Sequence, residues 1–133
     1  MPDETLQVIR KIAGGNEPVR LALMMDLQGA SGTEQAVFHY VVETDVDESA
    51  EADFNAWYDQ EHLPGLAAVP GTVRARRLRS LDGAPRYHAC YELLSDQVLA
   101  SPPWLAVRHT SWSDRVRPRF RNTRRAMFAL PGR

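Results

Sequence analysis

Residues 36–64 read AVFHYVVETDVDESAEADFNAWYDQEHLP, and this stretch decides the fold. Its first nine residues are rich in β-branched and aromatic side chains, which predicts a strand over 36–44. The acidic residues that follow, up to Ser49, are typical of a helix N-terminus. Proline lacks a backbone N–H, so Pro64 is expected to end the helix near His62 or Leu63, although residues 63–69 could add one loose turn. One broad face of that helix carries Phe54, Trp57, Tyr58, Glu61 and His62.

The rest of the chain repeats this alternation of strands and helices. Further strands are predicted at 72–80, 86–94 and 124–130, with a helical region over 97–106 that Pro102 and Pro103 interrupt. The order from residue 36 is therefore βαββαβ. This order predicts an α+β, ferredoxin-like domain, with a four-stranded antiparallel sheet and both helices on one face.

The other face of such a sheet has no cover of its own. Apolar strand residues on that face would be exposed to water unless a second sheet packs against them. Either the residues named at the end of this paragraph or their neighbours on the alternate face would be exposed in this way. We therefore expect a homodimer in which two sheets meet face to face. The strand positions concerned are Val37, Val41, Ala75, Cys90 and Met127.

Residues 1–35 precede this pattern and are interpreted as an N-terminal extension, with the ferredoxin-like domain at 36–133. Apolar residues at helical spacing predict a helix over Thr5 to Ala13, ended by Gly14 and Gly15. Val19 to Leu27 is short and apolar, and fits either a strand or a helical turn. The extension is expected to pack on the domain or on a partner subunit.

Composition limits the classes of protein that need be considered. The 133 residues suit one domain, and 44% of them are hydrophobic, without a run long enough to cross a membrane. The acidic N-terminus does not resemble a secretory signal. A single cysteine suits a reducing compartment, so we expect a cytoplasmic protein without membrane association.

Charge is distributed unevenly along the chain. Residues 1–66 hold thirteen acidic and three basic side chains, a net charge of −10, and residues 67–133 hold four acidic and thirteen basic ones, a net charge of +9. Elements of opposite sign that lie against each other, within one fold or across a dimer, would account for this. The basic run Arg115 to Arg121 is then a solvated connector that faces the acidic first helix, or a site for an anionic substrate. The aromatic strand signature of RNA-binding ferredoxin-like domains is missing, so no nucleic-acid partner is expected.

The helix motif Phe54 to Pro64, followed by Val69-Pro70-Gly71, resembles the first helix of the dimeric α+β barrel superfamily, in particular its EthD-like branch. The Arg-bearing strand Val73 to Arg79 and the stretch Trp112 to Arg115 match that group in order and spacing. The resemblance implies homodimers with a pocket between the helices and the sheet of each subunit. Cofactor-free monooxygenases, polyketide cyclases, isomerases, decarboxylases and haem-dependent enzymes all occur in the superfamily, so fold alone does not settle function.

His62 is the first candidate for chemistry. An imidazole can exchange a proton near neutral pH, and the resemblance places the matching histidine in the pocket. Tyr58 lies one helical turn earlier and is its expected partner, with His88 as a further catalytic candidate. Each also has a structural interpretation: His62 as a helix cap, Tyr58 as a core aromatic, His88 as a satisfied core histidine. His39 and His88 would approach each other if they face the same side of the sheet.

The candidates for ligand binding are His39, Trp57, Glu61, Arg77 and Trp112. No metal site is expected, because the chain has no His-x-x-x-His, no cysteine pair and no Glu-x-x-His. No cofactor is expected either, because no Rossmann or P-loop glycine pattern occurs. The first hypothesis is a cofactor-independent enzyme that acts on a small aromatic or polyketide-like molecule by acid/base chemistry. The alternative is a non-catalytic accessory or small-ligand-binding protein of a catabolic pathway.

Overall fold

The computed structural model describes residues 5–9 and 18–132, and the side chains of 20–132. Its strands are β1 (Thr5–Ile9), β2 (Pro18–Gln28), β3 (Phe38–Val46), β4 (Thr72–Ser80), β5 (Tyr87–Leu93) and β6 (Phe120–Ala129). Its α-helices are α1 (Glu51–Trp57), α2 (Leu63–Ala67), α3 (Pro102–Arg108) and α4 (Ser111–Val116). Single turns of tighter or wider helix lie at Glu48–Ala50, Tyr58–His62, Asp96–Ala100 and Arg117–Arg119.

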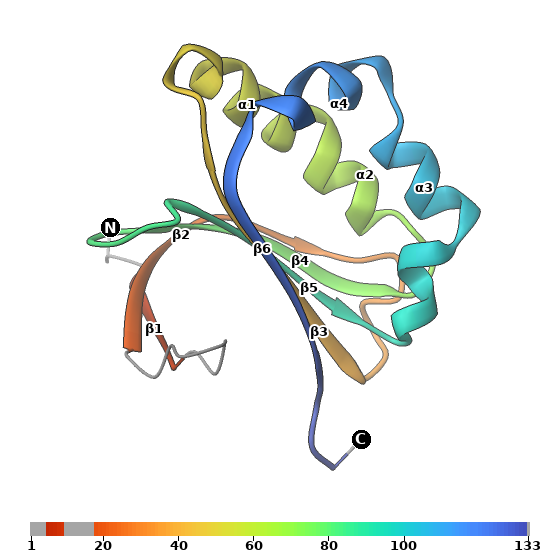
Figure 1. Ribbon diagram of the computed structural model, residues 1–133. Coiled ribbons are helices and arrows are strands. Elements are labelled where there is room, and N and C mark those ends of the chain that lie inside the picture. The colour runs from red at the N-terminus through yellow and green to blue at the C-terminus, as the bar shows by residue number, and fades with distance from the viewer. Residues whose placement is uncertain (1–4, 10–17, 133) are drawn as a thin grey trace.

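One antiparallel sheet carries all of these strands, in the order β1-β2-β4-β5-β3-β6. The four strands from β4 to β6 have the order of a ferredoxin-like domain, which confirms the predicted α+β fold. The helices form a second layer across one face of the sheet (Figure 1). The fold is thus two layers, and the space between them is where the large side chains lie.

The N-terminal part of the chain adds strands to this sheet. Residues Thr5–Ile9 form β1 and pair with β2, so the helix predicted over Thr5 to Ala13 is wrong for these five residues; 10–13 lie outside the described residues. A run of five residues fits the hydrophobic period of a helix as well as that of a strand. Pairing with the edge of β2 selects the strand. β2 in turn pairs with β4, which selects the strand for the segment that was left open between a strand and a helical turn. The division of the chain at residue 35 stays a prediction.

The first helix does not end before Pro64, in contrast to the prediction. It continues as α2 through Pro64 to Ala67, after one wider turn at Tyr58–His62. In that turn the N–H of Leu63 bonds to the carbonyl of Tyr58, five residues back. Pro64 then stands in the first turn of α2, where a missing N–H costs little.

The C-terminal region is more helical than predicted. The two prolines begin α3 rather than interrupt a helix, and α4 follows it after Thr110, whose side chain caps its N-terminus. The last strand begins at Phe120 instead of Arg124, because β6 pairs with β3 from Val46 to Phe38.

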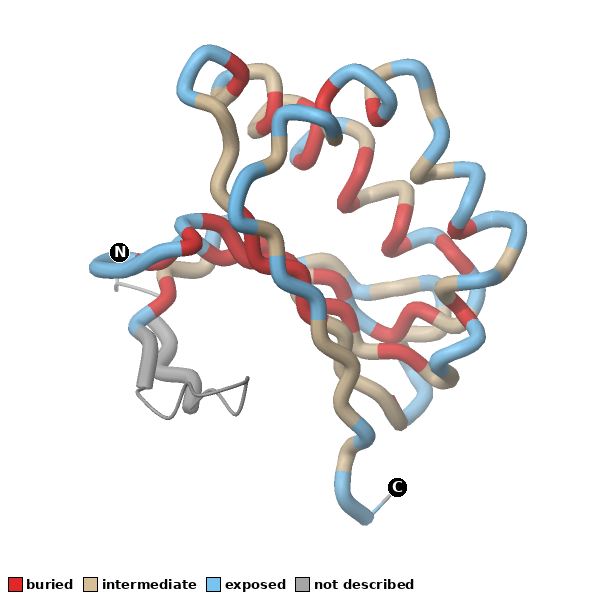
Figure 2. Tube along the Cα trace, in the orientation of Figure 1, coloured by how far each residue is buried: buried red, intermediate tan, exposed pale blue. Residues whose placement is uncertain are grey.

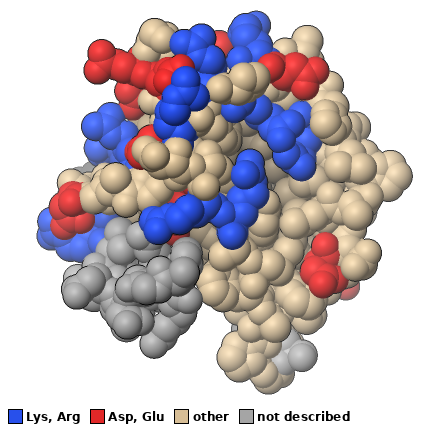
Figure 3. Space-filling model, viewed as in Figure 1, with Lys and Arg blue, Asp and Glu red and all other residues tan. Residues whose placement is uncertain are grey.

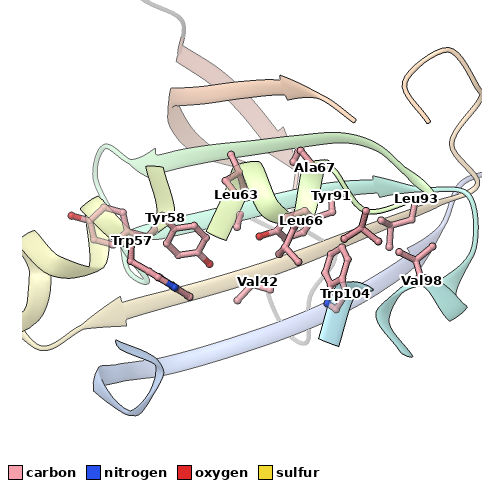
Figure 4. Packing of buried hydrophobic residues seen from close by; sticks show 14 of the residues in the cluster. Val42, Trp57, Tyr58, Leu63, Leu66, Ala67, Tyr91, Leu93, Val98 and Trp104 are labelled. Atoms are coloured by element: carbon pink, nitrogen blue, oxygen red, sulfur yellow. The ribbon is translucent and has the colours of Figure 1, made fainter. Parts of the chain in front are cut away.

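The hydrophobic core fills the space between the helices and the sheet. Buried positions line the inner side of both layers (Figure 2), and side chains from each layer meet in the close view (Figure 4). Trp57, Phe54 and Leu63 are completely buried on the helical side, and Tyr91 from β5 faces them. Each such side chain contributes about 1.5–3 kcal/mol by leaving water, so this layer stabilises the whole domain.

The uneven charge of the chain is explained by contacts between its two halves. Arg115 of α4 pairs with Asp53 of α1, and Arg119 and Arg121 both pair with Asp47 just before α1. The prediction that elements of opposite sign lie against each other is confirmed. Among the residues described, no helix is long and apolar enough to span a membrane.

Candidate functional site: a cavity between the helices and the sheet

A cavity opens between the helical layer and the inner face of the sheet. Counted together with the open solvent at its mouth, its empty space is about 370 Å³. Aromatic and basic side chains form most of its wall, which consists of Tyr40, Val42, Trp57, Tyr58, His62, Leu66, Tyr91, Trp104, Arg108, Arg117, Phe120 and Arg125.

The wide turn Tyr58–His62 supplies two of these residues. A π-type turn adds one residue to a helix and rotates the following side chains, and such turns occur often at functional sites. Here it brings Tyr58 and His62 to the same cavity, with their ring centroids 5.2 Å apart. His62 also stacks on Trp57 at a centroid distance of 4.1 Å. The chain therefore holds the imidazole between two aromatic rings.

His62 is buried, with 7% of its surface exposed, yet its Nδ1 has no hydrogen-bond partner among the described residues. Burial, together with the positive charges of Arg108 and Arg117, lowers the pKa of His62 to about 3. The imidazole is therefore neutral at physiological pH and able to accept a proton or a hydrogen bond. A buried polar nitrogen without a partner is unfavourable for stability, which points to a role in binding or catalysis.

Tyr58 is the second polar group that the turn brings to the cavity. Burial raises its pKa to about 12, so the phenol stays protonated and can donate a hydrogen bond. The guanidinium of Arg77 lies over its ring at 4.7 Å from the centroid. Burial also raises the pKa of Tyr91, which lies on the cavity wall opposite.

Three arginines give the cavity its charge. Arg108 ends α3, Arg117 begins the turn before β6, and Arg125 lies opposite Val42 in the β3–β6 pair. No aspartate or glutamate lines the cavity. Figure 3 shows basic side chains around the hollow in the middle of this face. The cavity is thus positively charged.

Two of the predicted site residues lie on the opposite face of the sheet. His39 and His88 alternate with the inward-facing Tyr40 and Tyr87, so they share the outer face with each other but not with the cavity. His88 Nε2 is 3.2 Å from the carbonyl of Pro85, and its Nδ1 is 3.8 Å from the carboxylate of Glu43. His39 packs beside the Phe128 ring. Neither histidine is brought together with His62.

Three further predicted residues brace the helices without lining the cavity. Glu61 accepts a hydrogen bond from Thr110 at 2.6 Å, and Trp112 donates one to Asp53 at 3.0 Å. Arg77 is buried on the inner face and donates to Asp59 at 2.7 Å. Trp57 does line the cavity, and its indole N–H donates to Ser113 of α4 at 3.1 Å.

Several cavity residues were not among the predicted site residues. Tyr40, Tyr91 and Trp104 were missed because an aromatic residue in a strand or helix is usually core. Arg125 could have been predicted from the sequence. It follows Arg124 along β6, and successive residues of a strand point to opposite faces of the sheet, so one of the two arginines must face the helices. Arg117 lies inside the basic run that was weighed as an anion site. Arg108 gave no signal in the sequence.

No group of three His, Cys, Asp or Glu side chains that could hold a metal ion occurs in the part of the chain that the structure describes.

The comparisons with known proteins concern the fold. No family model and no curated protein sequence matches the chain. Among solved structures, a candidate monooxygenase from Fusobacterium nucleatum is similar with a TM-score of 0.66 at 10% identity, over 88% of this chain and 53% of that one. A second candidate monooxygenase, from Lactobacillus acidophilus, gives a TM-score of 0.60 at 10% identity, over 84% and 51%. The chain therefore spans about half the length of these two proteins.

The heme-degrader MhuD of Mycobacterium tuberculosis, with two hemes bound in its active site, is similar along nearly its whole length. Its TM-score is 0.55 at 18% identity, over 71% of this chain and 95% of that one. At such low identity the likeness shows that this chain has the same ferredoxin-like α+β fold.

Proposed function

We propose that this protein is a cofactor-independent enzyme that acts on a small aromatic or polyketide-like molecule by acid/base chemistry in the cavity. The observation that carries the proposal is the buried imidazole of His62, which lines the cavity with a ring nitrogen that has no partner among the described residues. The wide helical turn that presents it together with Tyr58 supports the same conclusion.

The reaction class that fits these groups is proton abstraction from a carbon next to a carbonyl. Neutral His62 takes the proton, the C–H electron pair passes into an enolate, and the Tyr58 hydroxyl donates a hydrogen bond to the enolate oxygen. An imidazole with a pKa of about 3 is a weak base. The substrate must therefore have an acidified C–H, as aromatic ketones and polyketide-like β-dicarbonyl compounds do.

Exchange of protons for deuterium tests this proposal directly. In D₂O, the protein should speed deuterium incorporation next to the carbonyl of 2-tetralone, an enolisable aromatic ketone, as followed by NMR. His62→Gln should slow the catalysed exchange by roughly a hundredfold or more. The matched control is His109→Gln, because His109 is an exposed histidine at the end of α3.

Equal exchange rates in the wild type and in His62→Gln would contradict the enzymatic proposal. Binding of the ketone in the cavity without any exchange would instead favour the alternative, a non-catalytic accessory protein that holds a small ligand. Circular dichroism of each variant shows whether the fold is retained.

We also propose that two copies of the chain pair through the outer face of the sheet, as the EthD-like helix motif implies. The supporting observation is the state of that face near β3 and β6, where His39, Ala126 and Phe128 are only half-buried within one chain. Cys90 of β5 is half-buried on the same face. A second sheet would cover these side chains and complete a barrel.

A further inference from the structure

The three cavity arginines differ from most arginines of the fold in having no partner. Elsewhere Arg74 pairs with Asp26, Arg77 with Asp59, and Arg124 with Glu43. Within residues 20–132, the guanidinium groups of Arg108, Arg117 and Arg125 form no hydrogen bond or ion pair with a side chain or a carbonyl. The guanidinium of Arg79 shares this state, but Arg79 does not line the cavity.

The arrangement of the three arginines is electrostatically unfavourable. Burial, followed by the charges of Arg108 and Arg125, lowers the pKa of Arg117, and the opposing effects of Asp114 and Tyr40 are smaller. Like charges that lie close together without an opposite charge between them repel one another, and this lowers the stability of the fold. Clustered groups of this kind inside a cleft are typical of a site that receives a ligand of opposite charge.

From this geometry we propose that the ligand of the cavity is an aromatic carboxylate, whose acidic group is bound by Arg108, Arg117 and Arg125. The proposal rests on the proposed function and names its substrate class. A guanidinium binds a planar carboxylate through two parallel hydrogen bonds, which suits this anion best. Tyr40, which is half-buried on the cavity wall, offers an aromatic ring to the planar body of the ligand.

A bound carboxylate also changes the base. Burial is the main cause of the low pKa of His62, and the charges of Arg108 and Arg117 lower it as well. The anion would offset those two charges, so the pKa of His62 rises and the imidazole becomes a stronger base. The coupling is reciprocal: the anion binds more tightly when His62 is protonated. Substrate charge thereby contributes to catalysis at the same site.

A pair of probes that differ in charge tests the proposal. Calorimetry should show that 2-naphthoate binds at least roughly tenfold more tightly than the neutral 2-naphthamide. Arg117→Gln and Arg125→Gln should each remove most of this preference and leave binding of the amide unchanged. Arg79→Gln, which removes the same charge elsewhere, should leave the preference intact.

Each outcome decides a separate point. Equal binding of acid and amide, or a preference that survives in both cavity variants, overturns the carboxylate assignment and leaves the aromatic site standing. Loss of the preference in Arg79→Gln as well would show a general charge effect and also overturns it. If neither probe binds a wild type that catalyses exchange on 2-tetralone, the carboxylate assignment fails and the proposed function stands.

Discussion

At the scale of single residues, the proposed chemistry depends on His62. Most buried polar groups of this fold have partners, such as the indole N–H of Trp57 with Ser113 and the hydroxyl of Thr72 with the carbonyl of Leu66. The Nδ1 of His62 has none within the described residues. A neutral, desolvated imidazole costs stability when it is forced to take up a proton, and this gives a measurable signature.

His62 should make the protein less stable in acid. Its folded-state pKa of about 3 lies below the ordinary 6.5, so the unfolded chain binds the proton first and stability falls as the pH drops below about 6.5. Between about pH 6.5 and 5 the loss should be about 2 kcal/mol. Urea unfolding measured at both pH values checks this.

The control for this prediction is His62→Gln, which cannot titrate and should lose about 2 kcal/mol less over the same range. His39, whose pKa is also lowered by burial, contributes to both proteins and cancels in the difference. Parallel pH profiles of wild type and His62→Gln would contradict the buried, neutral state of the imidazole.

At the scale of elements, the first helix and the turn behind it set the site. The wide turn at Tyr58–His62 rotates the helix, and α2 then carries the chain to the turn at Gly71, where β4 begins. Gly71 has a φ of +98°, a conformation that favours glycine. Its N–H bonds to Ser31 and its carbonyl accepts from Leu94, so this residue joins three parts of the chain.

Gly71→Ala should lower the free energy of unfolding by about 1–3 kcal/mol. A Cβ at this position lies 2.6 Å from a Val98 methyl group, in addition to the strain of the positive φ. Chemical denaturation followed by fluorescence measures the change. Gly83→Ala is the matched control, because its Cβ meets only the Ser80 hydroxyl at 3.4 Å and should change stability by less than about 0.5 kcal/mol.

At the scale of the whole molecule, the sheet has one covered face and one open face. The helices cover the inner face from α1 to α4, and the strand β2 extends the sheet beyond β4 (Figure 1). The outer face near β6 keeps half-buried side chains that include Phe128. The proposed dimer follows from this difference between the two faces.

The protein should therefore sediment as a dimer at micromolar concentration. Phe128→Glu places a charge on the outer face and should shift the sedimenting mass to that of a monomer, since an unpaired charge buried in an apolar interface is costly. Leu105→Glu is the control, because Leu105 is an exposed apolar residue of α3 on the other layer. A wild-type protein that sediments as a monomer would contradict the dimer.

The sequence by itself determined the α+β class and the order of the central strands and helices. These follow from local pattern: period-two strands, an aromatic helix face and turn residues between them. It did not determine the strand at Thr5–Ile9, because a short apolar run takes its conformation from the edge it pairs with. The passage of the helix through Pro64 was decided by the wide turn before it.

Only the tertiary structure decided which residues form the site. His39 and His88 have side chains as suitable as His62, but strand register turns both to the outer face. Arg108, Arg117 and Arg125 come from three separate elements, and they meet only because α3, the turn after α4 and β6 pack around one cavity. Local sequence determines which face of its own helix or strand a residue occupies, whereas its neighbours in space depend on long-range packing.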